Sequence, residues 1–344
     1  MTACNFATIK GNKTMAFGAD TTTDEVLDGI DMTGRRVLIT GASGGLGEET
    51  ARAMASKGAI VTITARDMAK GEAVAEKIRK STGNPNIDVR ELELSVPDSV
   101  RAFAAGYLAD HDSLDLLINN AGVMARPLGR TVEGWEMQFA TNHIGHFLLT
   151  NLLISALKKS AADGRKPRIV NLSSAAHRFG TVDFDDIHFD NREYDKWGAY
   201  GQSKTANVLF SVELNKRLAD DGITANALHP GGIMTDLGRH LSPEDIADLM
   251  SRRPVGDDGN EVEAEEVEPA EIDPENPPGI KMKTIPAGAA TTCWGATAAE
   301  LEGKGGLYLD DCQIGDPADY AIDPEGASKL WAVTEEILGE KFDL

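Results

Sequence analysis

The sequence predicts an α/β fold, a single doubly wound parallel sheet of about seven strands flanked by helices. From Arg35 onward, short apolar runs alternate with longer segments of helical period, which is typical of βαβ units. Polar or glycine-rich motifs end several of the apolar runs, where open α/β sheets bind ligands. With 344 residues, we expect an N-terminal extension over 1–30 and one domain over 31–344, with an insertion over 238–285.

The expected elements follow one another in a regular order. Val37, Leu38 and Ile39 form an apolar run that leads into a glycine-rich turn and then into a segment of helical period. The expected strands are residues 35–40, 59–64, 87–93, 114–119, 168–173, 223–229 and 306–309. The expected helices are residues 46–57, 96–111, 132–159, 199–220, 287–300 and 324–338.

Composition excludes several classes of protein. Hydrophobic residues make up 41% and charged residues 26% of the chain, as in ordinary folded domains. The formal net charge of -21 repels phosphate backbones, so we expect no nucleic acid partner. No apolar stretch approaches the roughly 18 residues of a membrane span, and no signal peptide is recognisable. The three cysteines are scattered, so we predict a cytoplasmic protein without a metal site.

Much of the negative charge lies in one segment of the insertion. Residues 257–275 hold ten acidic residues and no lysine or arginine. This composition predicts a solvated surface loop, and an acidic arm that docks a partner is the alternative.

A glycine-rich turn follows the first expected strand. Residues 40–47 read Thr-Gly-Ala-Ser-Gly-Gly-Leu-Gly, and glycines at this point let the backbone approach a pyrophosphate at the positive end of a helix. The spacing differs from G-x-G-x-x-G, and a turn that only closes a tight corner is the alternative. The expected cofactor-binding residues of the turn are Gly41, Ser43, Gly44, Gly45, Leu46 and Gly47.

Arg66 stands 19 residues after Gly47, at the end of the second expected strand. An acidic residue at this point accepts a hydrogen bond from a ribose 2′-hydroxyl, whereas arginine accommodates a 2′-phosphate. The sequence therefore favours NADP(H) over NAD(H). Asp67 is adjacent and argues for NAD(H), and an ordinary surface charge is the alternative for Arg66.

Tyr200 and Lys204 are four residues apart, hence on one face of an expected helix. Alone, the pair could be a solvent-facing contact. Three further motifs end expected strands: Asn-Asn-Ala-Gly at 119–122, Ser-Ser at 173–174 and His-Pro-Gly-Gly at 229–232. Because the carboxyl ends of parallel strands share one edge of a sheet, we expect these motifs and the glycine turn to converge on one crevice.

These motifs, in this order, resemble the short-chain dehydrogenase/reductase family over residues 31–237 and 306–338, and the glycine spacing resembles its non-extended branch. Ile-Val-Asn-Leu-Ser-Ser-Ala-Ala-His at 169–177 and Ala-Asn-Val-Leu-Phe at 206–210 are similar to the retinol dehydrogenase-like subgroup. The resemblance implies a Rossmann fold, an NAD(P)-dependent enzyme acting on CH–OH or C=O groups, and a substrate lid within the insertion.

The resemblance also implies roles for individual residues. Ser174, Tyr200 and Lys204 would form a catalytic triad, with Asn142 as its fourth member. Glu93-Leu94 would lie near the adenine, where many members have Asp-Leu. Tyr200 and Lys204 would also contact the cofactor, with Lys204 holding the nicotinamide ribose hydroxyls; the other implied cofactor contacts are Asn120, Ala121, Gly122, Pro230, Gly231, Ile233 and Thr235.

Elementary chemistry is consistent with these roles. Hydride transfer at a carbinol carbon requires proton movement on its oxygen, and a free tyrosine with a pKa of about 10 is too weak a base. Lowering this pKa to about 7 takes roughly 4 kcal/mol, which Lys204 and an oxidised nicotinamide could supply. Ser174 would stabilise negative charge on the substrate oxygen; backbone capping is the alternative, which we favour for Ser173 only. Asn142 would position a water beside Lys204, or bond within the core.

The connection from Ser174 to Tyr200 is 25 residues long and rich in aromatic side chains. It either covers an apolar substrate or is pinned to the body of the protein. We expect a dehydrogenase or carbonyl reductase for a lipophilic or aromatic substrate; the alternatives are a C=C reductase resembling protochlorophyllide reductase and a non-catalytic NADP-sensing module. A homodimer is compatible with the resemblance. The aromatic residues are Phe179, Phe184, Phe189, Tyr194 and Trp197.

Overall fold

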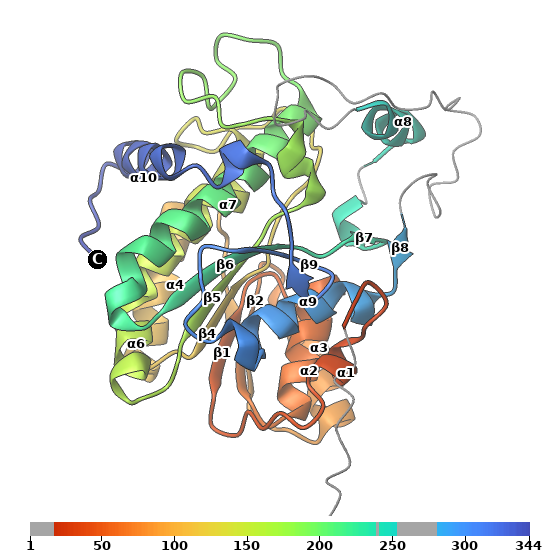
Figure 1. Ribbon diagram of the computed structural model, residues 1–344, viewed down its shortest axis with the longest axis vertical. Coiled ribbons are helices and arrows are strands. Elements are labelled where there is room, and N and C mark those ends of the chain that lie inside the picture. Colours follow the sequence, from red (N-terminus) through yellow and green to blue (C-terminus); the bar gives the residue numbers. More distant parts are fainter. Residues whose placement is uncertain (1–16, 239–240, 253–280) are drawn as a thin grey trace, which may run out of the picture.

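The computed structural model describes residues 17–238, 241–252 and 281–344, and its central element is an eight-stranded sheet (Figure 1). The strand order is β10-β9-β6-β5-β4-β1-β2-β3, and all neighbours are parallel except β9 and β10. The chain order reverses between β1 and β4, so a crevice forms at their carboxyl ends. The strands are β1 (Arg36–Ile39), β2 (Ile60–Ala65), β3 (Ile87–Glu91), β4 (Leu116–Asn119), β5 (Arg168–Leu172), β6 (Thr224–His229), β9 (Tyr308–Asp310) and β10 (Gln313–Ile314).

Helices cover both faces of the sheet (Figure 1). One face packs against α2 (Gly45–Ser56), α3 (Met68–Thr82) and α9 (Ile285–Thr297), with the short α1 (Thr23–Val26) against α9. The opposite face packs against α4 (Pro97–Asp110), α6 (Gly145–Ala162), α7 (Lys196–Leu218) and α10 (Pro324–Leu338).

Strand β1 shows why its sequence is apolar without alternation. Val37 and Ile39 belong to the core beneath α2 and α9, whereas Leu38 belongs to the core beneath α6 and α7. All three side chains are buried. Helices on both faces bury both sides of a parallel strand, so the predicted doubly wound fold is confirmed.

The expected helix over 132–159 is wrong at its start. Arg130 and Glu136 form an antiparallel bridge around a turn in which Gly134 has a φ of +90°. Helix α5 (Met137–Phe139) begins only after this turn, and residues Ala140–Ile144 are π-helical before α6 begins. The turn interrupts a segment whose apolar pattern alone suggested continuity.

Three short strands escaped sequence reasoning. The edge strand β10 adds an eighth member to the sheet, and β7 (Gly232–Ile233) pairs with β8 (Met282–Lys283) outside it. Each has only two residues, which is too short for an alternating pattern to be recognised.

The insertion contributes one described helix, α8 (Pro243–Ser251), while the acidic residues 257–275 lie outside the described residues. In the predicted N-terminal extension, Val26 and Leu27 are buried against the core that includes α9. Among the helices that the structure describes, none combines the length and apolar character needed to cross a membrane. The described part of the chain also holds no cluster of His, Cys, Asp and Glu side chains suited to a metal ion.

Candidate active site

The glycine turn between β1 and α2 requires glycine at Gly41, Gly45 and Gly47, through backbone conformation or close packing. Gly41 and Gly45 have φ angles of +63° and +59°, a region that favours glycine. A Cβ added to Gly47 would lie 2.6 Å from Asn120 Nδ2 and 2.8 Å from the Ala42 Cα. Helix α2 starts here without a side-chain cap on its first N–H groups. The turn therefore fits the pyrophosphate of a dinucleotide, which would bind these amides.

Thr40 ties the glycine turn to the end of β4. Its Oγ1 accepts hydrogen bonds from the backbone N–H groups of Asn120 at 2.9 Å and Ala121 at 3.0 Å. Asn120 Nδ2 in turn donates to the carbonyl oxygens of Thr40 and Gly41 at 2.8 and 3.2 Å. Two motifs that lie 80 residues apart therefore meet, as the shared-edge argument expects.

The segment after β6 borders the same turn. Thr235 Cγ2 would lie 3.4 Å from a Cβ on Gly45, and Ile233 packs on Gly288 of α9. Gly231 has a φ of +98°, and its Cα faces the side chain of Lys283 from β8. Pro230, Gly231, Ile233 and Thr235 follow β6, which lies two strands beyond β4 in the sheet, on the side away from β1.

Lys283 is a residue of this wall that sequence reasoning missed. Its side chain is buried, and its ammonium group pairs with Asp311, which follows β9. Asp311 has a φ of +50°. No local pattern links these residues to Gly231, because they come together only through the pairing of β7 with β8 and of β6 with β9.

Arg66 and Glu93 form one ion pair at the ends of β2 and β3, 3.5 Å apart. The Arg66 side chain is 57% exposed, so its guanidinium can also reach a ligand at this edge. Asp67 is used otherwise, since its Oδ1 accepts the Lys70 N–H at 3.0 Å and caps α3. Lys70 was missed by sequence reasoning; its Nζ lies 3.9 Å from where a Gly44 Cβ would be.

Tyr200, Lys204 and Ser174 lie together at the carboxyl edge of the sheet. Tyr200 and Lys204 lie one turn apart on α7 and are both 4% exposed. The Lys204 ammonium is 5.6 Å from the centre of the Tyr200 ring and donates to the Leu172 carbonyl oxygen at 2.9 Å. Ser174 follows β5 and bonds with Tyr200.

Burial controls the protonation of this group. It raises the pKa of Tyr200 to about 12, although the hydrogen bond with Ser174 opposes the shift. Burial also lowers the pKa of Lys204 to about 8. The protein's own groups therefore hold the proton on Tyr200 at neutral pH, where it can be donated.

Both serines bond to the backbone, although sequence reasoning favours this role for Ser173 only. Ser173 Oγ donates to the Lys204 carbonyl oxygen at 2.8 Å, as a backbone-bonding residue would. Ser174 also bonds to backbone, because its Oγ accepts the Ala176 N–H at 3.2 Å and caps the short helix Ala175–Phe179. Ser174 combines both roles because the chain turns directly at its position.

Asn142 is fully buried in the π-helical segment, and its side chain bonds within the protein. Its Oδ1 accepts the Val123 N–H at 2.8 Å, while Nδ2 donates to the Val123 carbonyl oxygen at 3.0 Å and to Ser203 Oγ at 2.9 Å. This is the core-bonding alternative. The predicted neighbour Gly122 lies between Asn142 and Lys204, since its Cβ would be 3.2 Å from Asn142 Oδ1 and 3.6 Å from Lys204 Nζ.

Two histidines hold the loop that carries Ser174, a role that the sequence did not suggest. His229 Nδ1 accepts the Ala175 N–H at 3.1 Å. His177 Nδ1 lies 2.7 Å from the Ser174 carbonyl oxygen, and its Nε2 accepts the Ala318 N–H. Burial lowers the pKa of both rings to about 4, so both remain neutral at physiological pH.

The aromatic residues of the connection between Ser174 and Tyr200 divide into two groups, one near Tyr200 and one that pins the connection to the body of the protein. Phe179 and Trp197 belong to an apolar cluster around Tyr200. Phe189 and Tyr194 instead contact each other edge to face, and Phe184 packs on the core beneath α7. We call the first group the Tyr200 cluster; its members are Met124, Ala125, Ala176, Phe179, Trp197, Tyr200, Leu241 and Leu249.

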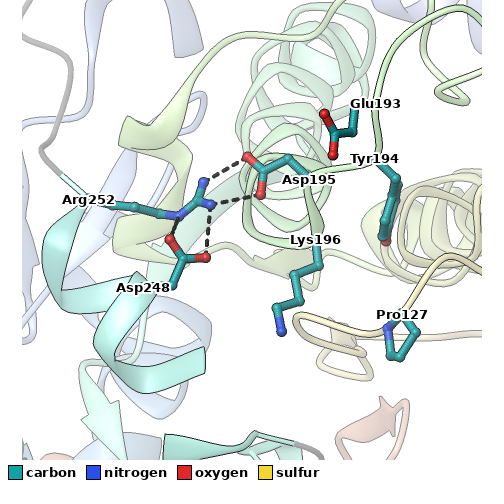
Figure 2. Close-up of a pocket in the computed structure, with 7 residues that line it drawn as sticks. All are labelled: Pro127, Glu193, Tyr194, Asp195, Lys196, Asp248 and Arg252. Carbon is teal, nitrogen blue, oxygen red and sulfur yellow. Dashed lines mark hydrogen bonds and ion pairs between the residues drawn. The ribbon is translucent and has the colours of Figure 1, made fainter. Parts of the chain in front are cut away.

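A pocket of about 410 Å³ opens near the start of α7 (Figure 2). Charged and polar side chains dominate its lining, so it does not offer the apolar surface that a lipophilic substrate needs. The apolar side chains that surround Tyr200 are those of the Tyr200 cluster. The lining residues are Pro127, Glu193, Tyr194, Asp195, Lys196, Asp248 and Arg252.

Comparison with known proteins agrees with this geometry. Residues 35–245 match the family model described as short chain dehydrogenase. The chain is 41% identical to human retinol dehydrogenase 12, covering 91% of this chain and 89% of that protein, and 40% identical to human retinol dehydrogenase 13, covering 89% and 85%. A crystal structure of an uncharacterised Mycobacterium paratuberculosis protein superposes with a TM-score of 0.70 at 33% identity, covering 94% of this chain and all of that one.

Proposed function

The chain belongs to the short-chain dehydrogenase family and is an NAD(P)-dependent oxidoreductase acting on CH–OH or C=O groups, and from this premise we propose that it is an NADPH-dependent reductase of lipophilic carbonyl compounds. The observation that carries the proposal is the position of the buried Tyr200, one helical turn before Lys204 on α7 and inside an apolar cluster. A non-catalytic sensor is thereby set aside.

In the direction of reduction, Tyr200 acts as an acid, and burial keeps its proton in place for donation. A nicotinamide cofactor, when bound, supplies the hydride for the carbonyl carbon. Tyr200 then donates its proton to the carbonyl oxygen, and the Ser174 hydroxyl stabilises the negative charge that develops there. With a pKa of about 12 for Tyr200, donation to an alkoxide is favourable, whereas acting as a base requires a further positive charge besides Lys204.

Arg66 supports the preference for NADP(H). It ends β2, where a ribose 2′-phosphate would lie, and more than half of its side chain is exposed. One carboxylate oxygen of Asp67 caps the N-terminus of α3, so this side chain has a structural role apart from the ribose. Lys70, one helical turn further, adds a second positive charge near Gly44.

The Tyr200 cluster supports a lipophilic substrate. Its side chains are apolar or aromatic, and it is contributed by α7, by the segment after β4, by the connection after β5 and by the insertion. Relatives named retinol dehydrogenases act, by that name, on a long apolar alcohol. A bulky apolar aldehyde or ketone, of retinoid, steroid or aromatic type, fits this surface.

The decisive experiment is Tyr200→Phe, with the consumption of NADPH measured on a panel of aliphatic, aromatic and retinoid carbonyls. Loss of the proton donor lowers kcat by about 10³-fold, while the Kd for NADPH changes by less than about threefold because one phenol oxygen supplies only a small part of the implied cofactor contacts. Tyr107→Phe removes another buried phenol on α4 and is the control. Turnover of Tyr200→Phe at the wild-type rate contradicts the proposal, and a product with a saturated C=C bond indicates the C=C reductase instead.

Cytoplasmic location and a homodimer stay predictions. One relative, at 40% identity, is named Short-chain dehydrogenase TIC 32 B, chloroplastic, of Brassica napus, and the chain covers 92% of it. Fractionation of the native source and size measurement in solution test the two predictions.

A further inference from the structure

Helix α8 has little intrinsic support for its position. It has nine residues, none of them buried, and helices this short are marginal in water. A capping box, in which Ser242 Oγ accepts the Asp245 N–H and the Asp245 carboxylate accepts the Ser242 N–H, stabilises its start. In Figure 1 the helix lies outside the layers formed by the sheet and its covering helices. Its place therefore depends on a few contacts.

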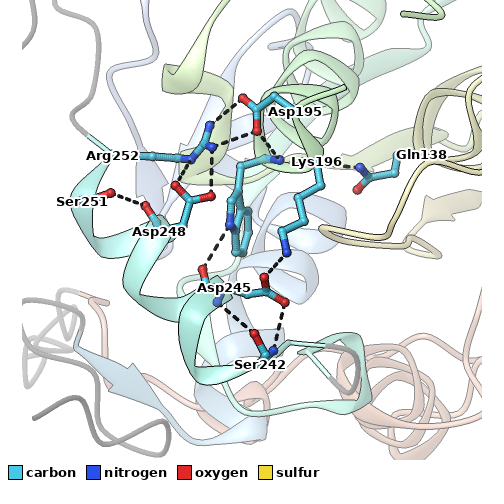
Figure 3. A network of polar contacts seen from close by, with 9 residues as sticks. Gln138, Asp195, Lys196, Ser242, Asp245, Asp248, Ser251 and Arg252 are labelled. Atoms are coloured by element: carbon cyan, nitrogen blue, oxygen red, sulfur yellow. Dashed lines mark hydrogen bonds and ion pairs between the residues drawn. The ribbon is translucent and has the colours of Figure 1, made fainter. Parts of the chain in front are cut away.

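Those contacts run to three consecutive residues at the start of α7 (Figure 3). The Arg252 guanidinium forms a bidentate ion pair with the Asp195 carboxylate, at 2.7 and 2.8 Å. Lys196 pairs with the Asp245 carboxylate, and Trp197 Nε1 donates to the Asp245 carbonyl oxygen at 3.1 Å. We call the Arg252–Asp195 and Lys196–Asp245 ion pairs the clamp.

The clamp joins the insertion to the helix that carries the proton donor. Asp195 is the N-cap of α7, and Tyr200 lies little more than one turn further along the same helix. From the other side of the contact, Leu241 and Leu249 pack against the cluster that contains Trp197 and Tyr200. The ion pairs and the apolar contacts therefore hold α8 against the start of α7 and against the cluster that contains Tyr200.

Water and ions reach the clamp from the charged pocket beside it (Figure 2). The Arg252 and Asp195 side chains are 24% and 44% exposed, and those of Lys196 and Asp245 are 28% and 15% exposed. Salt screens partly exposed pairs, and the screening length falls from about 10 Å at 0.1 M to about 3 Å at 1 M. Ionic strength is therefore the variable to which the clamp responds.

The pH, unlike the ionic strength, is not the variable to which the clamp responds. Burial alone would raise the pKa of Asp195, but the Arg252 guanidinium more than compensates, and the net pKa lies below its ordinary value. The charged groups that face Asp195 and Arg252 are each other and Asp248 on α8. The Arg252–Asp195 ion pair thus persists at any pH above the lowered pKa of Asp195. It is lost only as the pH falls through that pKa.

We propose that Arg252 and Lys196 are positioning residues, which act through the clamp to hold α8 as the outer wall of the substrate chamber beside Tyr200. This inference rests on the proposed reduction of lipophilic carbonyls. Without the clamp, α8 moves, and Leu249 together with the preceding Leu241 contacts the substrate only part of the time. Binding of a bulky apolar substrate therefore weakens. The chemical step and cofactor binding do not involve α8 and keep their rates and affinities.

The test compares Arg252→Gln and Lys196→Gln with the wild type in the full-length protein, at 0.05 and 0.5 M NaCl. For the wild type, the KM of a bulky apolar ketone rises about threefold between the two salt concentrations, although added salt ordinarily favours apolar contacts. Each variant has a KM about fivefold higher at low salt and a weaker dependence on salt. Both retain the wild-type kcat and NADPH affinity, and Arg252→Lys, which keeps one charge-assisted bond, is intermediate.

Asp248→Asn is the matched control. It removes the second partner of Arg252, which lies within α8, and leaves both ion pairs to α7 in place. Its KM and salt response stay close to those of the wild type. Equal effects of Asp248→Asn and Arg252→Gln would overturn the proposal, because they would show that the internal stability of α8 matters and the link to α7 does not.

Hydrogen exchange separates this inference from the proposed function. Measured by mass spectrometry without substrate or cofactor, the amides of residues 243–252 exchange faster in Arg252→Gln and in the wild type at high salt. Unchanged exchange, or faster exchange with an unchanged KM, overturns the positioning role. Absence of wild-type turnover on every carbonyl overturns the proposed function instead, and salt-dependent protection of α8 then supports the clamp alone.

Discussion

Helices α8 and α9 differ in how they are held, although only residues 252–284 separate them along the chain. Helix α9 buries ten of its 13 residues beneath the glycine-turn side of the sheet, whereas α8 buries none of its nine. Close packing makes the position of α9 unique, because any shift opens cavities. Ion pairs and two leucines hold α8, so it can move at a small cost in free energy. The side of the site that we propose for the cofactor is thus rigid by packing, and the side that we propose for the substrate is held by charge.

The largest effect is expected for Trp294→Ala in α9. The indole is 5% exposed and donates to Glu300 Oε1 at 2.9 Å. Truncation leaves a cavity between α9 and the sheet and lowers the free energy of unfolding by about 3–5 kcal/mol. Urea denaturation measures the loss. A loss below about 1 kcal/mol would contradict the view that packing holds the cofactor side.

Gly47→Ala tests the glycine turn. The added Cβ would overlap Asn120 Nδ2 and the backbone of Gly41 and Ala42, so the turn must open. We expect NADPH binding to weaken by about 100-fold or more, as calorimetric titration would show. Gly106→Ala on α4 is the control, because its Cβ would meet nothing closer than 4.0 Å, and it should stabilise that helix slightly. Unaltered NADPH affinity would mean that the turn only closes a corner.

Arg66→Gln sharpens the identity of the cofactor. Loss of a charge-assisted bond to a 2′-phosphate weakens NADPH by about 10- to 100-fold and leaves NADH within about twofold. The two affinities are measured by fluorescence titration. Arg101→Gln is the control. It removes a surface ion pair between Arg101 on α4 and Glu340, and it should alter neither affinity. Equal losses for both cofactors would show that Arg66 does not contact the 2′-phosphate.

The pH dependence of kcat tests Tyr200 and Lys204, which lie between the proposed cofactor and substrate sides. Because burial lowers the pKa of Lys204 to about 8, the ammonium loses its proton as the pH rises through this value, well before Tyr200 with a pKa of about 12. The kcat for carbonyl reduction should therefore be flat below pH 7 and fall about tenfold per unit above pH 8. A rate profile that stays level to pH 10 would show that the charge of Lys204 is not needed.

The smallest effect on stability is expected for Leu249→Ala in α8. The side chain is only partly buried against the Tyr200 cluster, so the free energy of unfolding falls by less than about 1 kcal/mol. The KM of a bulky apolar ketone nevertheless rises severalfold, since this side chain contributes to the chamber wall. A decrease of several kcal/mol in the free energy of unfolding would show that close packing holds α8 as it holds α9, and the contrast between the two helices would be wrong.

The sequence by itself determined the doubly wound sheet, the glycine turn and the Tyr200–Lys204 pair. Each depends on a local pattern: the apolar run at Val37–Ile39, glycines that leave a strand and open a helix, and two residues one helical turn apart. The convergence of the strand-end motifs also followed from sequence, because parallel strands place their carboxyl ends at one edge.

Only the tertiary structure decided how distant side chains share their bonds. Asn142 bonds to Val123 and Ser203, which are 19 and 61 residues away, and Arg252 reaches Asp195 across 57 residues. Ser174 caps a short helix and also meets Tyr200. Periodicity reports which face of an element is apolar, whereas these pairings depend on where separate backbones lie in space. Sequence reasoning therefore identified the catalytic triad that we propose, but not the clamp that holds α8 beside it.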